Sequence, residues 1–174
     1  RDRVLIPALD KIGAEFEKGT LFLPQLIMSA GVAQAAFEVI RKHMVMSDNA
    51  PVSKGKIVIA TVKGDVHDIG KNIVKVLLEN YGYDVIDLGK DVEYQAVVDA
   101  IRDNDVKLCG LSALMTTTLV SMKETIALIR ENNLDCKVMV GGAVLTPEYA
   151  KEIDADFYAK DAKESVDIAK RVLG

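Results

Sequence analysis

A histidine set among acidic residues and bounded by glycines is the part of this sequence best suited to chemistry. It lies in Gly64-Asp65-Val66-His67-Asp68-Ile69-Gly70 and is one of two histidines among 174 residues. In an extended loop, Asp65 and His67 stand one residue apart, so their side chains can point the same way and hydrogen-bond. A carboxylate that holds one ring nitrogen leaves the other as a metal ligand or a base.

The flanking residues indicate where this histidine lies. Residues 56–62 form an apolar run typical of a buried strand, and residues 70–78 have the apolar spacing of a helix. Open α/β sheets bind ligands in the crevice outside the carboxyl ends of their strands. We therefore expect His67 at the crevice of such a sheet.

Strand-like and helix-like segments alternate from residue 56 onwards. This pattern predicts an α/β fold, a flavodoxin-like five-stranded parallel sheet of order 2-1-3-4-5 with its crevice between the first and third strands. We expect strands near 56–62, 83–88, 106–111, 136–140 and 156–159, and helices near 70–81, 93–104, 118–132, 147–153 and 162–173.

The first part of the chain has a different pattern. Residues 1–46 are expected to be two helices, the first ending at Gly19 and the second beginning near Pro24. Each helix can bury only one face, so they predict a partial helical-bundle cap. Residues 47–55 read as a linker and 56–174 as the flavodoxin-like domain. Because the chain starts with Arg1 rather than Met, we expect that upstream residues have been lost.

Composition restricts the partners. With 22 Lys+Arg against 26 Asp+Glu the net charge is -4, which argues against nucleic acid or an anionic membrane as the main ligand. Neither a membrane-length apolar run nor a secretory signal is apparent, so a cytoplasmic protein is expected. Cys109 and Cys136 lie in or beside apolar runs and are interpreted as core residues rather than a disulfide or metal pair.

Three segments fall at or just past the carboxyl ends of neighbouring strands. They are the histidine loop, Ser112-Ala113-Leu114 and Gly141-Gly142. In the predicted strand order they rim one deep cleft, and their small residues leave room for a bulky group beside the sheet. Hydroxyls of Ser112 and Thr116 to Thr118 can serve its polar atoms.

The ordered set of motifs resembles a known signature. Asp65-x-His67-x-x-Gly70, then 41 residues, Ser112-x-Leu114, then 26 residues, and Gly141-Gly142 is similar to the cobalamin-binding module of methionine synthase and related corrinoid proteins. Leu21-Phe22-Leu23-Pro24-Gln25, followed by Ser29-Ala30, resembles the last two helices of that family's four-helix cap. The resemblance covers essentially the whole chain but only about half of a cap.

The resemblance implies a role for each matching residue. His67 is the lower axial cobalt ligand, replacing the cofactor's dimethylbenzimidazole (base-off/His-on), while Asp65 bonds its other nitrogen and Thr118, in place of the family's serine, completes the relay. The displaced base enters the cleft lined by Ser112, Leu114, Gly141 and Gly142, with Thr116 near it. The other implied cofactor contacts are Gly64, Val66, Asp68, Ile69, Gly70, Ala162 and, over the upper face, Phe22.

It also implies a function and partners. The chain is expected to be a methyl carrier, non-catalytic by itself, whose cobalamin or related corrinoid (methyl-, hydroxo- or Co(II) form) cycles between Co(I) and methyl-Co(III). A substrate-specific methyltransferase supplies the methyl group from a donor such as methanol, a methylamine or an aryl methyl ether. A second methyltransferase passes it to tetrahydrofolate or a thiol, and a reductive activase restores the cofactor.

Other functions fit parts of the pattern. An adenosylcobalamin-dependent mutase subunit shares the histidine loop but generally lacks a cap, and a cobalamin-based regulator or light sensor shares both. A flavodoxin-like domain without a corrin is a further alternative. Zinc is disfavoured because no second histidine or cysteine stands at ligand spacing from His67.

Each motif also has a purely structural interpretation. His67 can be a loop or cap residue, Gly141-Gly142 a simple turn, and Thr117 or Thr118 the N-cap of the next helix. Phe22 and Met28 can be bundle core as readily as a corrin contact. His43 is interpreted as a surface residue or a partner of the helix dipole.

Overall fold

The computed structural model describes residues 53–174 continuously and separate positions before them. Those positions are residues 8, 11, 12, 15, 18–22, 25, 28, 29, 31, 32, 35, 36 and 39. They are helical except for 18–22, where Gly19 has a φ of +72°, as suits a glycine that ends a helix. The remainder of the expected cap, His43 and most of the expected linker lie outside the described residues.

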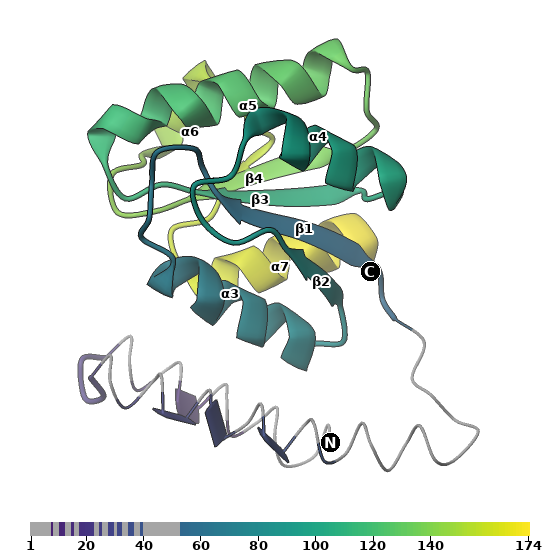
Figure 1. Cartoon of the computed structure of the whole chain (residues 1–174). Helices are drawn as coiled ribbons and strands as arrows, with labels where there is room; N and C mark the ends of the chain where they lie inside the picture. The colour runs from purple at the N-terminus through teal and green to yellow at the C-terminus, as the bar shows by residue number, and fades with distance from the viewer. Residues whose placement is uncertain are drawn as a thin grey trace.

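From residue 53 the chain alternates between strands and helices (Figure 1). All strand pairs are parallel, in the order β2-β1-β3-β4-β5, which confirms the predicted sheet. The elements are β1 (Lys56–Thr61), α3 (Ile69–Asn80), β2 (Asp84–Asp87), α4 (Tyr94–Asp103), β3 (Leu108–Ser112), the 3-10 turn η1 (Thr116–Thr118), α5 (Leu119–Glu131), β4 (Lys137–Gly141), α6 (Pro147–Glu152), β5 (Phe157–Tyr158) and α7 (Ala162–Leu173).

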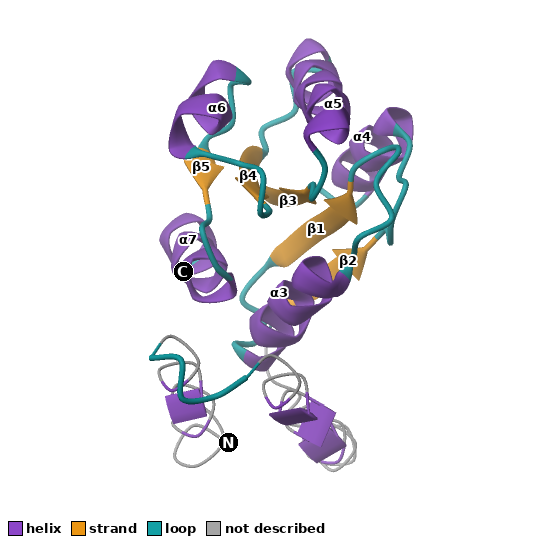
Figure 2. Ribbon diagram, turned by 90° about the vertical axis from the view of Figure 1, so that its left-hand side faces the viewer, coloured by secondary structure: helices purple, strands orange, loops and turns teal. Residues whose placement is uncertain are grey.

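Helices cover both faces of the sheet. Figure 2 shows α3 and α7 on one face and α4, α5 and α6 on the other. Along β1, Ile57 and Ile59 belong to the core shared with α3 and α7, whereas Val58 and Ala60 belong to the core under α4 and α5. Burial on both faces explains why the strands are continuous apolar runs rather than alternating ones.

The strand register aligns the segments expected to form the cleft. Thr61, Ser112 and Gly141 lie side by side at the carboxyl ends of β1, β3 and β4. Two residues earlier, Gly110 lies between Ile59 and Met139 in the same three strands. The predicted site positions on β3 and β4 are therefore direct neighbours.

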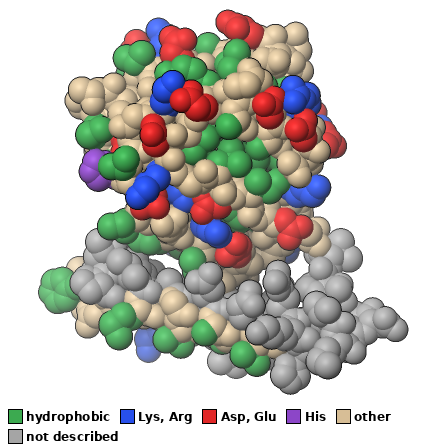
Figure 3. Space-filling view, viewed as in Figure 1, with side chains coloured by type: hydrophobic (Ala, Val, Ile, Leu, Met, Phe, Trp, Pro, Cys, Tyr) green, Lys and Arg blue, Asp and Glu red, His purple; other side chains and the backbone are tan. Residues whose placement is uncertain are grey.

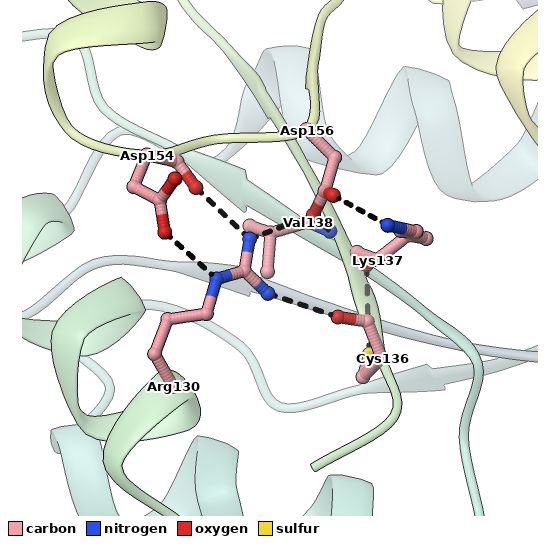
Figure 4. Close-up of polar contacts among 6 residues, drawn as sticks. All are labelled: Arg130, Cys136, Lys137, Val138, Asp154 and Asp156. Carbon is pink, nitrogen blue, oxygen red and sulfur yellow. Dashed lines mark hydrogen bonds and ion pairs between the residues drawn. The ribbon is translucent and has the colours of Figure 1, made fainter. Parts of the chain in front are cut away.

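A network around Arg130 holds the opposite end of the sheet together (Figure 4). From the last turn of α5, its Nη2 donates to Oδ2 of Asp156 at 2.7 Å and its Nε to Oδ2 of Asp154 at 3.1 Å. Asp156 also accepts from the amide of Val138 at 2.8 Å and from Nζ of Lys137 at 2.9 Å. These bonds join α5, the start of β4 and the segment entering the two-residue strand β5.

The surroundings of Asp156 determine its pKa. Burial raises it, but hydrogen bonds from the Val138 amide, Lys137 and Arg130 outweigh burial, and the pKa of Asp156 lies below its usual value. A carboxyl whose pKa is lowered by folding stabilises the fold above its unfolded pKa of about 3.9. That stabilisation is lost as the pH falls through the folded-state pKa.

Asp156→Asn is therefore expected to lower the free energy of unfolding by about 2 kcal/mol near neutral pH, because the charge-assisted bonds are lost. The difference from wild type should shrink below about pH 4, where the wild-type carboxyl also becomes protonated. Urea unfolding across pH measures both quantities. Asp103→Asn, whose partner Arg102 is exposed, is the control and should cost under about 0.5 kcal/mol. A loss that does not depend on pH would contradict the interpretation.

Candidate functional site

The loop between β1 and α3 carries His67 over the carboxyl end of the sheet. It turns immediately after β1, where the amide of Asp65 donates to the carbonyl of Val62 at 3.0 Å. Gly64 has a φ of +83°, a conformation that favours glycine. The turn brings Asp65 into the protein interior and leaves His67 partly exposed.

One carboxylate oxygen of Asp65 holds His67. Oδ1 accepts the backbone amide of His67 at 3.0 Å and lies 2.7 Å from its Nδ1. Both bonds form within a two-residue span, as the spacing of Asp65 and His67 suggests. The carboxylate therefore orients both the backbone and the ring of the histidine.

The other oxygen of Asp65 holds the segment after β3. Oδ2 accepts the amides of Leu114 at 2.7 Å and Met115 at 3.2 Å and lies 2.9 Å from Oγ1 of Thr118. Thr118 occupies the N-cap position of α5, but its hydroxyl makes no capping bond to that helix. The hydroxyl turns towards the buried carboxylate because that is the stronger acceptor.

These contacts determine the charge of Asp65 and which ring nitrogen of His67 faces it as a donor. Burial raises the pKa of the Asp65 carboxyl, but hydrogen bonds from the His67 and Leu114 amides, the His67 ring and Thr118 together hold it well below its usual range. An ionised carboxylate can only accept hydrogen bonds, so Nδ1 of His67 carries the ring proton. In the neutral imidazole, Nε2 is then left with its lone pair.

Apolar side chains surround the histidine at the surface. The side chain of His67 is 45% exposed, and Val66, Ile69 and Leu114 are between 42% and 60% exposed. Figure 3 shows such apolar side chains in green beside the purple of a histidine at the molecular surface. Large apolar residues gathered around a polar group mark a ligand surface.

A cavity of about 1080 Å³ lies between the sheet and helices α3 and α7. Five of the predicted site residues line it: Gly70, Ser112, Gly141, Gly142 and Ala162. Leu114 and Thr116, which were expected in or near the cleft, do not line the cavity. The amide of Leu114 points to Asp65, so its side chain turns outward to the surface; Thr116 is exposed at the start of η1.

Sequence reasoning missed the floor and walls of this cavity. Gly110 and Met139 form part of the floor, and Lys71 lines the wall on α3, where its buried Nζ lies 2.7 Å from Oδ1 of Asp87. A glycine inside an apolar strand, such as Gly110, signals a close approach and was the available clue. Other missed lining residues include Ile73, Val74, Leu77, Tyr81, Tyr158 and Val166.

The glycine pair after β4 has a structural role as well. Gly142 has a φ of +137°, and a Cβ added there would lie 1.9 Å from the carbonyl oxygen of Ala113. The ends of β3 and β4 can therefore approach only because residue 142 is glycine. Gly141 and Gly142 thus form the turn after β4 and also line the cavity.

Phe22 and Met28 are not buried among the described residues. The side chain of Phe22 is 69% exposed, and its backbone amide donates to Oε1 of Gln25 at 2.8 Å. Met28 is likewise exposed. A contact of Phe22 with a cofactor stays a prediction.

The metal-ligating side chains at this site suit a metal ion that is already coordinated by a cofactor. Within the described part of the chain, His, Cys, Asp and Glu form no group of three or more able to hold a bare ion. Cys109 and Cys136 are free and buried, as expected of core residues, and burial raises the pKa of the Cys136 thiol to about 12. What remains is one imidazole nitrogen beside an apolar surface and a large cavity. That arrangement suits a metal held in a bulky macrocycle.

The fold and the site thus define a flavodoxin-like domain with a histidine at its ligand-binding edge, and comparison with known proteins specifies its family. A family model described as a B12 binding domain matches residues 55–167, and a second of the same description matches residues 2–41. The chain belongs to the family of B12-binding corrinoid proteins, and its cofactor class is a corrinoid.

Relatives and solved structures agree with this family. Dimethylamine corrinoid protein 1 of Methanosarcina acetivorans is 41% identical over 99% of this chain and 81% of its own length. The methanol:cobalamin methyltransferase complex MtaBC from Methanosarcina barkeri matches with a TM-score of 0.83 and 31% identity over 99% of this chain and 66% of that chain. A cobalamin-binding protein from Desulfitobacterium hafniense has a TM-score of 0.78 and 34% identity over 95% of this chain and 78% of its own.

No helix in the described residues is both long enough and apolar enough to cross a membrane.

Replacing the central carboxylate tests the site's geometry without any cofactor. Asp65→Asn leaves one acceptor oxygen and places the NH₂ of the new amide against N–H or O–H donors. We therefore expect a loss of about 3 kcal/mol in the free energy of unfolding. Urea unfolding of the cofactor-free protein measures this loss. Asp68→Asn, in the same loop but without a side-chain capping bond, is the matched control and should change stability by under about 0.5 kcal/mol. Equal stabilities of the two variants would contradict the role given to Asp65.

Proposed function

We propose that this chain is a methyl-carrying corrinoid protein that binds its cofactor base-off/His-on, with Nε2 of His67 as the lower cobalt ligand. The observation that carries the proposal is the 2.7 Å contact between Oδ1 of Asp65 and Nδ1 of His67, which leaves Nε2 of this partly exposed side chain free for a ligand. A carboxylate behind a ligating histidine is the usual support of such a ligand. The bound corrinoid supplies the chemistry of methyl transfer, and the protein positions and tunes it.

The cavity between α3 and α7 suits the cofactor's displaced base. Ser112, Gly141, Gly142 and Ala162 line it near the carboxyl ends of the strands, and Val74 and Met139 add apolar wall and floor. A planar aromatic base fits a cavity whose walls are largely apolar and carry polar groups that can fix its orientation. Val66, Ile69 and Leu114 provide the apolar surface for the macrocycle.

The relay behind His67 orients its ring. The Asp65 carboxylate holds Nδ1 at 2.7 Å, so the opposite nitrogen, Nε2, is presented in a fixed direction. Thr118 keeps that carboxylate in place from the opposite side, 2.9 Å away.

Similarity supports a methylamine as the methyl donor. Several relatives at 41–42% identity are dimethylamine corrinoid proteins, whereas the methanol complex is 31% identical. We infer that a methylamine-specific methyltransferase loads this chain. A second methyltransferase passes the methyl group to tetrahydrofolate or a thiol, and a reductive activase restores oxidised cofactor. The chain itself is the non-catalytic carrier.

The ligand assignment is tested with hydroxocobalamin and purified protein. Wild type should bind it, and the reduced Co(II) form should show nitrogen coupling in its electron paramagnetic resonance spectrum that changes when histidine is labelled with ¹⁵N. His67→Gly should lose this label-dependent coupling. His43→Gly, at the chain's other histidine, should retain it. Label-dependent coupling that persists in His67→Gly would refute the assignment.

The donor is tested with reduced, cobalamin-loaded protein and two methyltransferases, one specific for dimethylamine and one for methanol. We expect the rate of cofactor methylation, followed by absorbance, to be at least about tenfold higher with the dimethylamine enzyme. A tenfold ratio corresponds to a difference of about 1.4 kcal/mol in free energy. The free cofactor with each enzyme is the control. Faster methylation from methanol would overturn the donor inference but not the assignment of His67.

A further inference from the structure

We propose that Asp91, which lies outside the histidine loop, is a positioning residue for His67. Its Oδ1 accepts the amide of Gly64 at 2.7 Å, and its own amide donates to the carbonyl of Asp65 at 2.9 Å. Through these two bonds Asp91 holds the backbone of Gly64 and of Asp65, the residues that form the turn. Asp91 lies outside the histidine loop, the Ser112-x-Leu114 motif and the Gly141-Gly142 pair.

Asp91 lies in the connection between β2 and α4, which runs beside the end of β1. Thr61 donates its amide to the carbonyl of Gly89 at 2.9 Å, and Val92 donates to the carbonyl of Thr61 at 3.2 Å. A bridge between Val62 and Val92 continues the pairing. These bonds hold the connection against the rigid strand, and Asp91 extends that support onto the turn at residues 64 and 65.

The backbone of Asp91 explains the choice of residue. Its φ of +53° lies in the left-handed region, which few non-glycine residues adopt and which aspartate and asparagine tolerate best. Glycine adopts this conformation more readily but offers no side-chain acceptor. Aspartate therefore combines the required backbone with the acceptor for Gly64.

The ion pair beside the turn does not replace the hydrogen bond that Asp91 accepts. Nζ of Lys63 lies 2.8 Å from Oε2 of Glu93, but both side chains are exposed, and exposed pairs contribute little. The path from Asp91 to the histidine is short: Asp91 holds the peptide groups of Gly64 and Asp65, and the Asp65 carboxylate holds Nδ1 of His67. Loss of the Asp91 acceptor should thus release the turn and move Nε2.

Three substitutions separate the acceptor from the backbone conformation. Asp91→Gly removes the acceptor but permits the left-handed backbone, Asp91→Ala removes both, and Asp91→Asn keeps both an oxygen acceptor and tolerance of that backbone. The control is Asp105→Gly, an aspartate with a φ of +50° in the connection between α4 and β3, at the other end of the sheet.

The first measurement uses cofactor-free protein. Hydrogen exchange at the Gly64 amide should be about fivefold to tenfold faster in Asp91→Gly and Asp91→Ala, the change expected for the loss of one hydrogen bond. It should be near the wild-type rate in Asp91→Asn and Asp105→Gly. A wild-type rate in Asp91→Gly would overturn the proposal.

The second measurement rests on the proposed function and uses the Co(II) cobalamin-loaded protein. The ratio of histidine-bound to histidine-free cobalt, read from the paramagnetic resonance spectrum, should fall about fivefold to tenfold in Asp91→Gly and recover in Asp91→Asn. An unchanged ratio in Asp91→Gly would overturn the positioning role. Failure of wild type to show histidine-bound cobalt would instead overturn the proposed function, and the exchange result would then decide the role of Asp91 in the turn.

Discussion

The candidate site depends on one buried charge. Asp65 is fully buried, and removing a carboxylate from water costs several kcal/mol unless donors replace the lost hydration. The donors come from His67 beside it in the chain and from Leu114, Met115 and Thr118, about fifty residues away. The carboxylate therefore fixes the histidine tautomer and holds the ends of β1 and β3 together with the same set of bonds. Folding and preparation of the site are inseparable here.

The two ends of the sheet have different tasks. At the amino-terminal end, Arg130 joins α5, β4 and the approach to β5 through bonds to Asp154 and Asp156. At the carboxyl end β1, β3 and β4 stop at small residues, and the close approach at Gly142 keeps β3 and β4 together without filling the space beside them. Rigidity supplied at one end allows a large cavity at the other.

The fold was predictable because its signals are local. Alternating apolar segments define the strands and helices, and most of the boundaries observed lie within one residue of those expected; β3 begins two residues later because Val106 bonds back to Ile101 at the end of α4. The contact of Asp65 with His67 follows from their spacing. The bond between the Thr118 hydroxyl and Asp65 does not follow from spacing, because a threonine before a helix is equally suited to capping that helix. The role of Asp91 depends on where a distant connection lies, which no local pattern reveals.

The apolar rim of the site follows from the polar contacts beneath it. Because the residues on either side of Val66 turn their side chains to one another, its own side chain must point away, and it is 55% exposed. Leu114 gives its amide to the carboxylate of Asp65, which leaves its side chain at the surface. Exposed apolar area is unfavourable in the free protein and becomes favourable when a ligand covers it. The bonds that satisfy one buried charge thus also leave exposed apolar side chains beside His67, where the proposed cofactor would lie.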